Sequence, residues 1–148
     1  MKVLIATDGS EYSQRALSRM GEFLPPKTSE VLLLMVIPNP NAGALGMIGP
    51  PYVDYAALAD QLRSEAQEVL TKGAAALESQ GFTPRVIYRE GDPSTEILDV
   101  AQQEDVGLIV VGSHGRTGVR RFLLGSVSAR VTTHAPCSVL VIKHPQSA

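Results

Sequence analysis

The stretch VLLLMVI, residues Val31–Ile37, consists of seven consecutive apolar residues without any alternation of polar and apolar side chains. A strand of this composition has no face for water and is typical of a parallel sheet covered on both sides. Three shorter apolar runs repeat the pattern, at Val3–Ala6, Leu108–Val111 and Val139–Ile142. The segment Arg85–Arg89 (RVIYR) is predicted as a further strand.

Segments with helical spacing alternate with these strands. Ser10 and Asp92 are suitable N-caps, whereas Pro25-Pro26 and Gly81 are expected to end their helices. A last short helix is predicted to start at Ser126. The helix after Ser10 is predicted to bury one face, made of Ala16, Leu17, Met20 and Leu24. The longest helix is predicted to bury one stripe, made of Tyr55, Leu58, Leu62, Ala66, Val69, Gly73 and Leu77.

The elements follow the order β-α-β-α-β-α-β-α-β. This order predicts a single doubly wound α/β domain over residues 1–148, Rossmann-like, with a parallel sheet and helices on both faces. In such sheets ligands bind beyond the carboxyl ends of the strands. Asp8, the loop Pro38–Pro51 and the segment Gly112–Ser126 all follow strand ends. We therefore expect them to meet in one crevice.

The composition excludes several classes of protein. The chain has 13 basic and 15 acidic residues and a net charge of −2, so nothing favours a nucleic acid or an anionic membrane as its partner. The apolar run in MKVLIATDGS is too short for a signal peptide or a membrane span. Cys137 is the only cysteine, so no internal disulfide can form. We expect a cytoplasmic protein.

The segment Gly112–Ser126, GSHGRTGVRRFLLGS, combines glycines with the start of a helix. Glycines let backbone N–H groups approach a ligand closely, and the first N–H groups of a helix attract anions. Phosphate is the expected ligand. Ser126 either caps its helix or donates its hydroxyl to a phosphate oxygen, and Ser128 lies in the same turn. The alternative is that the glycines only allow the chain to turn. The segment is neither a Walker A loop nor the dinucleotide fingerprint.

The spacing Gly112-x-x-Gly115, nine residues, then Gly125-Ser126 resembles the G-2x-G-9x-G-S/T motif of the ATP-binding branch of the universal stress proteins. The start VLIATDGS, the segment GLIVVGSHGRTG and the end LLGSVSARVTTHAPCSVLVIK also resemble that family. The resemblance implies a five-stranded parallel α/β domain, ATP binding, a role in the stress response and a homodimer. It implies that the adenosine is held by Ala6, Thr7, Asp8 and Val36. It implies phosphate contacts at Gly112, Gly115, Gly125, Ser126, Val127 and Ser128.

Several single residues leave two interpretations open. Asp8 either accepts hydrogen bonds from the adenosine or only forms a turn with Gly9 and Ser10. His114 is a phosphate donor or a general acid, or else an exposed loop histidine, which we favour. Among the arginines we expect only Arg116, the one nearest the glycines, to close over the phosphates. We expect Cys137 to be a packed thiol.

No spacing of His, Cys, Asp or Glu predicts a metal site, so we expect Mg²⁺ to arrive with the nucleotide and to be held through its phosphates. No nucleophile is paired with a base, and no lysine lies in the phosphate loop, so we predict no catalytic residues. A regulatory nucleotide-binding protein is the favoured function. A slow ATPase or another nucleotide-dependent enzyme is the alternative, and the intact motif disfavours a nucleotide-free interaction module. The edge position expected for Val139–Ile142 predicts that this strand forms the homodimer interface.

Overall fold

The structure is a computed structural model that describes residues 1–39, 54–114 and 124–143. One five-stranded sheet has the strand order β3-β2-β1-β4-β5, and every strand pair is parallel. Its strands are β1 (Lys2–Thr7), β2 (Glu30–Ile37), β3 (Pro84–Glu90), β4 (Leu108–Gly112) and β5 (Ser138–Ile142). The predicted α/β fold with five parallel strands is therefore confirmed. The chain builds outward from β1 to β3 and then returns to the other side of β1, so the winding direction switches between β1 and β4.

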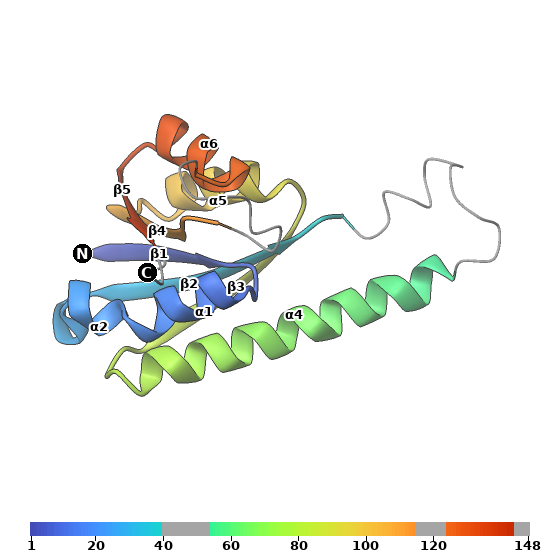
Figure 1. Cartoon of the computed structure of the whole chain (residues 1–148), viewed down its shortest axis with the longest axis horizontal. Helices are drawn as coiled ribbons and strands as arrows, with labels where there is room; N and C mark the ends of the chain where they lie inside the picture. The colour runs from blue at the N-terminus through green and yellow to red at the C-terminus, as the bar shows by residue number, and fades with distance from the viewer. Residues whose placement is uncertain (40–53, 115–123, 144–148) are drawn as a thin grey trace, which may run out of the picture.

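Helices cover both faces of this sheet (Figure 1). One face carries α1 (Glu11–Ser18), α2 (Met20–Phe23) and α4 (Tyr55–Glu78), and the other carries α5 (Pro93–Gln103) and α6 (Ser126–His134). A short 3₁₀ helix, Pro26–Thr28, precedes β2. Within the described ranges, no helix combines the length and the apolar character that a membrane span requires.

The packing of helices on both faces of the sheet explains why the sequence of β2 is apolar throughout. Val31, Leu33 and Met35 belong to the apolar core under α1 and α4, whereas Leu32 and Leu34 belong to the core under α5 and α6. Successive side chains of a strand point to opposite faces. Because both faces are covered, a polar residue at any of these positions would lose its contact with water, and the sheet is stabilised by burial on both sides.

The predicted helix from Ser10 to Leu24 is interrupted. Ser10 is the N-cap, as predicted, and its hydroxyl accepts a hydrogen bond from the Ser13 N–H. The helix then breaks at Arg19 (φ −109°, ψ 5°) into α1 and α2. The prediction of one continuous helix from Ser10 to Leu24 is therefore wrong.

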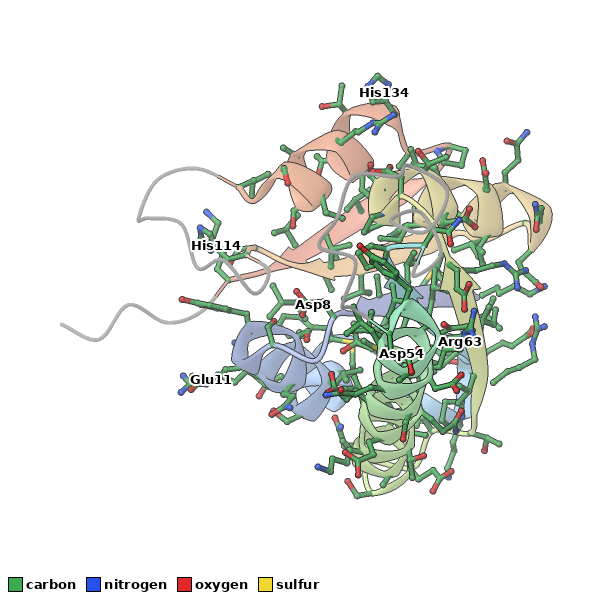
Figure 2. All side chains as sticks on the ribbon, turned by 90° about the vertical axis from the view of Figure 1, so that its right-hand side faces the viewer. Asp8, Glu11, Asp54, Arg63, His114 and His134 are labelled. Atoms are coloured by element: carbon green, nitrogen blue, oxygen red, sulfur yellow. The ribbon has the colours of Figure 1, made fainter. Side chains whose placement is uncertain are left out.

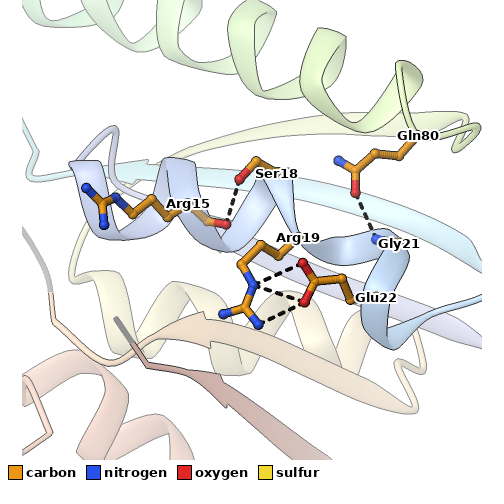
Figure 3. A network of polar contacts seen from close by, with 6 residues as sticks. All are labelled: Arg15, Ser18, Arg19, Gly21, Glu22 and Gln80. Carbon is orange, nitrogen blue, oxygen red and sulfur yellow. Dashed lines mark hydrogen bonds and ion pairs between the residues drawn. The ribbon is translucent and has the colours of Figure 1, made fainter. Parts of the chain in front are cut away.

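Gln80 explains this break (Figure 3). In a continuous helix the Gly21 N–H would donate to the Leu17 carbonyl, four residues earlier. Here the Gln80 Oε1 accepts from the Gly21 N–H at 2.8 Å, and the Gln80 Nε2 donates to the Leu17 carbonyl at 2.8 Å. The side-chain amide thus replaces one helical hydrogen bond, and such an insertion is a known cause of helix kinks.

The long helix α4 departs from its predicted stripe at the amino-terminal end. Leu58 is 43% exposed, whereas the buried residues are Ala59, Ala66, Leu70, Gly73 and Leu77. Leu58 belongs to the first turn of α4, and the amino-terminal end of this helix extends beyond the end of the sheet (Figure 1). Further along, α4 packs closely, because a Cβ on Gly73 would lie 3.0 Å from Leu33 Cδ2 and 3.2 Å from Leu17 Cδ1.

Candidate functional site

A cavity of about 450 Å³ lies at the carboxyl ends of β1, β2 and β4. This volume is within the range of sites for small molecules and cofactors. Figure 2 views this end of the molecule, with Asp8 and His114 labelled. The first turn of α6 lines the cavity too, so the predicted meeting of these segments in one crevice is confirmed for their described parts. Nine of the predicted site residues line the cavity: Ala6, Thr7, Asp8, Val36, Gly112, Gly125, Ser126, Val127 and Ser128. Gly115 and Arg116 lie outside the described residues.

The turn from β1 into α1 is held by a network of short polar side chains. The Asp8 Oδ1 accepts from the Ser10 N–H and from the Ser13 hydroxyl, both at 2.9 Å. The hydroxyl of the buried Thr7 donates to the Ser13 Oγ at 3.1 Å. Asp8 therefore has the turn-forming role that the sequence offered as one alternative. The same residue lines the cavity, so the turn also holds a carboxylate at the site.

The end of β4 is tied to the start of α6. The Gly125 N–H donates to the Ser113 carbonyl at 2.8 Å, and the Ser128 hydroxyl donates to the Gly112 carbonyl. Gly125, not Ser126, is the N-cap, and no side chain of the described residues caps the helix. The alternative that Ser126 caps α6 is therefore wrong, and its exposed side chain has no capping role. The uncapped first turn of α6 presents N–H groups and a positive helix-dipole end to the cavity.

The glycines at this junction are not required by the conformation of the backbone. Gly125 has φ −58° and ψ 159°, which any L-residue can adopt. Gly112 is not among the described glycines with positive φ, and a Cβ there would be 3.6 Å from its nearest neighbour, the His114 carbonyl oxygen. Because this is an ordinary contact distance, a turn requirement does not explain these glycines. Glycine is also used where a ligand approaches the backbone closely, because it has no Cβ.

His114 is not the exposed loop residue that the sequence favoured. It is half-buried and lines the cavity, and its ring lies 5.6 Å from the Tyr12 ring. Its Nδ1 is 3.1 Å from the Ser113 Oγ. Its Nε2 is buried and has no hydrogen-bond partner among the described residues. A loop that follows a strand is normally exposed, whereas His114 is half-buried because its ring contacts Tyr12 of α1.

The other wall of the cavity is largely apolar and was not predicted as a site. It is formed by the end of β2, by α4 and by the start of α5, through Leu34, Met35, Ile37, Leu62, Ala66, Pro93 and Ile97. Sequence reasoning assigned such residues to the core, because helical and strand periodicity is the same for a core face and for a cavity wall. Ser13 and Glu65 are polar lining residues that it also missed. For Ser13, the spacing Ser10-x-x-Ser13 was a weak indication of a role at the site. For Glu65, the sequence pattern gave no such indication.

An ion pair holds α4 in place next to this wall. The Arg63 Nε lies 2.7 Å from the Glu90 Oε1, which also accepts from the Tyr88 hydroxyl at 2.8 Å. The Arg63 hydrogen bond holds the pKa of the Glu90 carboxyl below its usual value, and the Tyr88 bond acts in the same direction. Burial, followed by the hydrogen bond to Glu90, raises the pKa of Tyr88 to about 12. This cluster anchors the part of α4 that contributes Leu62 and Ala66 to the cavity.

Cys137 is the packed thiol that the sequence predicts. It is half-buried against the apolar core under α5 and α6, and burial raises the pKa of its thiol, which disfavours the reactive thiolate. Within the described ranges, no group of three or more His, Cys, Asp or Glu residues is placed to hold a metal ion.

The chain is a doubly wound α/β domain with a cavity beside the switch point of its parallel sheet, the place where ligands bind in proteins of this class. A sequence model described as the universal stress protein family matches residues 1–143. The chain belongs to the universal stress protein family, as its motifs predict. Universal stress protein MJ0531 of Methanocaldococcus jannaschii is 34% identical over 146 residues, covering 98% of this chain and 83% of that protein.

Solved structures agree with this assignment. The structure of hypothetical protein MJ0577, also of M. jannaschii, is similar to this chain with a TM-score of 0.82 and 34% identity. The similarity covers 99% of this chain and 97% of the MJ0577 chain. The universal stress protein from Archaeoglobus fulgidus in complex with dAMP has a TM-score of 0.67 at 22% identity, with 97% and 98% of the two chains covered. At this lower identity the likeness shows the fold alone.

Proposed function

We propose that this protein is an ATP-binding member of its family that acts as a regulatory nucleotide-binding homodimer in the stress response. The observation that carries the proposal is the junction of β4 and α6. There, two glycines without a conformational requirement and an uncapped helix amino terminus face one cavity. Backbone N–H groups in this arrangement bind phosphate.

The two walls of the cavity divide the nucleotide between them in this proposal. Ala6, Thr7, Asp8 and Val36 hold the adenosine beside the apolar wall, which matches the apolar faces of a purine. The phosphates lie at Gly112 and at the first turn of α6, with Gly125, Ser126, Val127 and Ser128 as contacts. Gly115 and Arg116 remain proposed phosphate ligands from the sequence motif. The dAMP complex of the A. fulgidus protein makes adenine monophosphates useful competitors in a binding experiment.

Mg²⁺ belongs to this proposal as part of the nucleotide. The described residues offer no cluster of carboxylates for a metal, whereas ATP carries oxygen ligands of its own. We propose that the ion is held through the phosphate oxygens and neutralises part of their charge.

Binding rather than turnover is the proposed activity. The described residues that line the cavity include no lysine or arginine that could stabilise the transition state of phosphoryl transfer, which leaves Arg116 as the proposed cation at the phosphates. The carboxylate of Asp8 accepts two hydrogen bonds in the β1–α1 turn, so we propose that it holds this turn rather than acting as a catalytic base. We expect any hydrolysis to be far slower than the roughly 10 per second that is typical of enzymes.

Three measurements on the purified protein test the function. Mass spectrometry of the co-purified small molecules is expected to find ATP, and calorimetric titration with Mg-ATP is expected to show binding to the emptied protein. A phosphate-release assay separates a binder from an ATPase. Several turnovers per second, abolished by one side-chain change at the cavity, would establish the enzyme instead. No heat at millimolar Mg-ATP together with no co-purified nucleotide would refute ATP binding.

The strand β5 supports the homodimer part of the proposal. Among the described strands it pairs with β4 alone and forms one edge of the sheet, as the sequence predicts for Val139–Ile142. Val139, Leu140 and Val141 are half-buried and therefore keep apolar surface at this edge. An apolar edge strand favours pairing with a second chain.

A further inference from the structure

Glu65 is a charged side chain on the largely apolar wall of the cavity. It lines the cavity from α4 together with Leu62 and Ala66, and residues three and four positions apart share one face of a helix. Glu65 is exposed, whereas Ala66 beside it is buried, so the carboxylate lies at the rim of the cavity. A ligand that fills the cavity can therefore reach this carboxylate.

The Glu65 carboxylate is steadied by its own helix. The Gln61 Nε2, one turn earlier on α4, donates a hydrogen bond to the Glu65 Oε1 at 3.0 Å. An ionised carboxylate can accept about four hydrogen bonds, and it has no proton to donate. Gln61 uses one of these positions, so Glu65 can still accept a hydrogen bond from an N–H or O–H group of a ligand.

The charges around the cavity orient a nucleotide within it. Asp8 and Glu65 place carboxylates on the side of the β1–α1 turn and α4, where they repel a phosphate. The uncapped amino terminus of α6 attracts a phosphate. Because α4 and α6 cover opposite faces of the sheet (Figure 1), the repulsion and the attraction act from opposite sides. The phosphates are therefore expected beside α6, and the uncharged part of the nucleotide towards α4.

The strand order indicates which part of the nucleotide lies near Glu65. The cavity crosses the carboxyl ends of three adjacent strands, in the order β4, β1 and β2. Neighbouring strands are separated by about 4.8 Å, so the ends of β4 and β2 are about 10 Å apart. A nucleotide laid across this width has its phosphate over β4, its ribose over β1 and its base over β2. Since α4 packs against β2, Glu65 lies on the side of the base.

We propose that the Glu65 carboxylate accepts a hydrogen bond from the exocyclic amino group of adenine and so selects adenine over a base with an oxygen at that position. The proposal rests on the proposed nucleotide-binding function and adds a residue that determines which base is bound. The apolar side chains of the wall suit the flat faces of any purine, so they do not distinguish one purine from another. A carboxylate accepts from an amino group but is repelled by a carbonyl oxygen, as in hypoxanthine.

The test measures the affinities of Mg-ATP and Mg-ITP by calorimetry. The two nucleotides share their ribose and phosphates, but ITP has a carbonyl oxygen where ATP has the amino group. Glu65→Gln keeps the size of the side chain and adds an amide donor that suits this oxygen. Glu68→Gln is the matched control, because it removes the same charge from an exposed position of α4 that is not among the described residues lining the cavity. Both positions are exposed and glutamine is a good helix former, so both variants are expected to fold.

We expect the wild-type protein to bind Mg-ATP about tenfold more tightly than Mg-ITP, as for one hydrogen bond to a charged group. Glu65→Gln is expected to remove or reverse this preference, and Glu68→Gln to keep it. Equal wild-type affinities for the two nucleotides, or a preference that survives in Glu65→Gln, would overturn the assignment of Glu65 while leaving nucleotide binding intact. Absence of binding of either nucleotide to the wild-type protein would refute the proposed function and this inference with it.

Discussion

The hydroxyl of Ser128 donates a hydrogen bond to the carbonyl oxygen of Gly112 and so joins the first turn of α6 to the end of β4. Ser128 is buried, whereas Ser126, two residues earlier, is exposed and makes no capping bond. The two serines of one helical turn therefore have different roles. Ser128 holds the junction together, and Ser126 remains available to a ligand.

This difference predicts distinct effects of two alanine substitutions. Ser128→Ala is expected to lower the free energy of unfolding by about 1–3 kcal/mol, because the half-buried Gly112 carbonyl loses the hydrogen bond from Ser128, and to weaken ATP binding as well. Ser126→Ala is expected to leave stability unchanged and to weaken ATP binding about tenfold to a hundredfold. Urea unfolding and calorimetry measure the two quantities. Equal effects of the two variants on stability would contradict the assignment.

Gly125→Val is expected to abolish ATP binding while the protein remains folded. The backbone angles at Gly125 suit any L-residue, so the added side chain mainly occupies the space proposed for phosphate oxygens. Gly107→Ala is the control, because a Cβ at this remote turn makes only ordinary contacts, the nearest being Met1 Cγ at 3.5 Å. Thermal melts of both variants measure their stability, and calorimetric titrations with Mg-ATP measure their affinity for the nucleotide. Wild-type ATP affinity in Gly125→Val would contradict the phosphate site.

Gln80→Ala is expected to destabilise the fold by about 1–2 kcal/mol without affecting the cavity. The variant removes both hydrogen bonds that replace the missing helical bond between Gly21 and Leu17. Gln67→Ala serves as the control, because Gln67 is an exposed residue of α4, the helix that Gln80 follows. The midpoint of urea unfolding is the measurement. Two variants with the same midpoint would show that the amide does not support the break.

The raised pKa of the Tyr88 phenol predicts that the protein loses stability at high pH. Its pKa is raised from 10.0 to about 12 in the folded protein, first by burial and then by the hydrogen bond to Glu90. The contribution of the neutral phenol is therefore complete below pH 10 and is lost as the pH rises towards 12. The ultraviolet absorbance of phenolate follows this ionisation. Tyr88→Phe is expected to remove a transition near pH 12, and an unchanged titration curve would refute the shift.

The proposed dimer predicts an asymmetry between the two edges of the sheet. Val141→Lys, on the edge strand β5, is expected to shift the protein towards monomer, because a charge would be buried at the interface. Val86→Lys is the control on the opposite edge strand β3, where the valine is already 43% exposed. Light scattering at micromolar concentration measures the mass. A monomeric wild-type protein, or dissociation by Val86→Lys alone, would contradict an interface at β5.

Local patterns in the sequence were enough to predict the sheet, the helix caps at Ser10 and Asp92, and the strand ends that line the cavity. Val31–Ile37 specifies a strand buried on both faces because no residue in it tolerates water. Ser10 and Asp92 specify helix starts because their side chains bond to N–H groups only three residues away. The glycines of the β4–α6 connection follow a strand directly, and ligand sites in such folds lie at strand ends. Each of these features depends on neighbours along the chain.

Only the tertiary structure decided the features that depend on distant partners. The break at Arg19 arises from Gln80, 63 residues beyond Leu17, and the burial of His114 arises from Tyr12 on another element. Leu58 fits the helical stripe but is exposed, because α4 extends past the sheet. Periodicity reports which side of a helix is apolar. It does not report where the covering element ends or which distant side chain completes a hydrogen bond, because those depend on the packing of segments far apart in the chain.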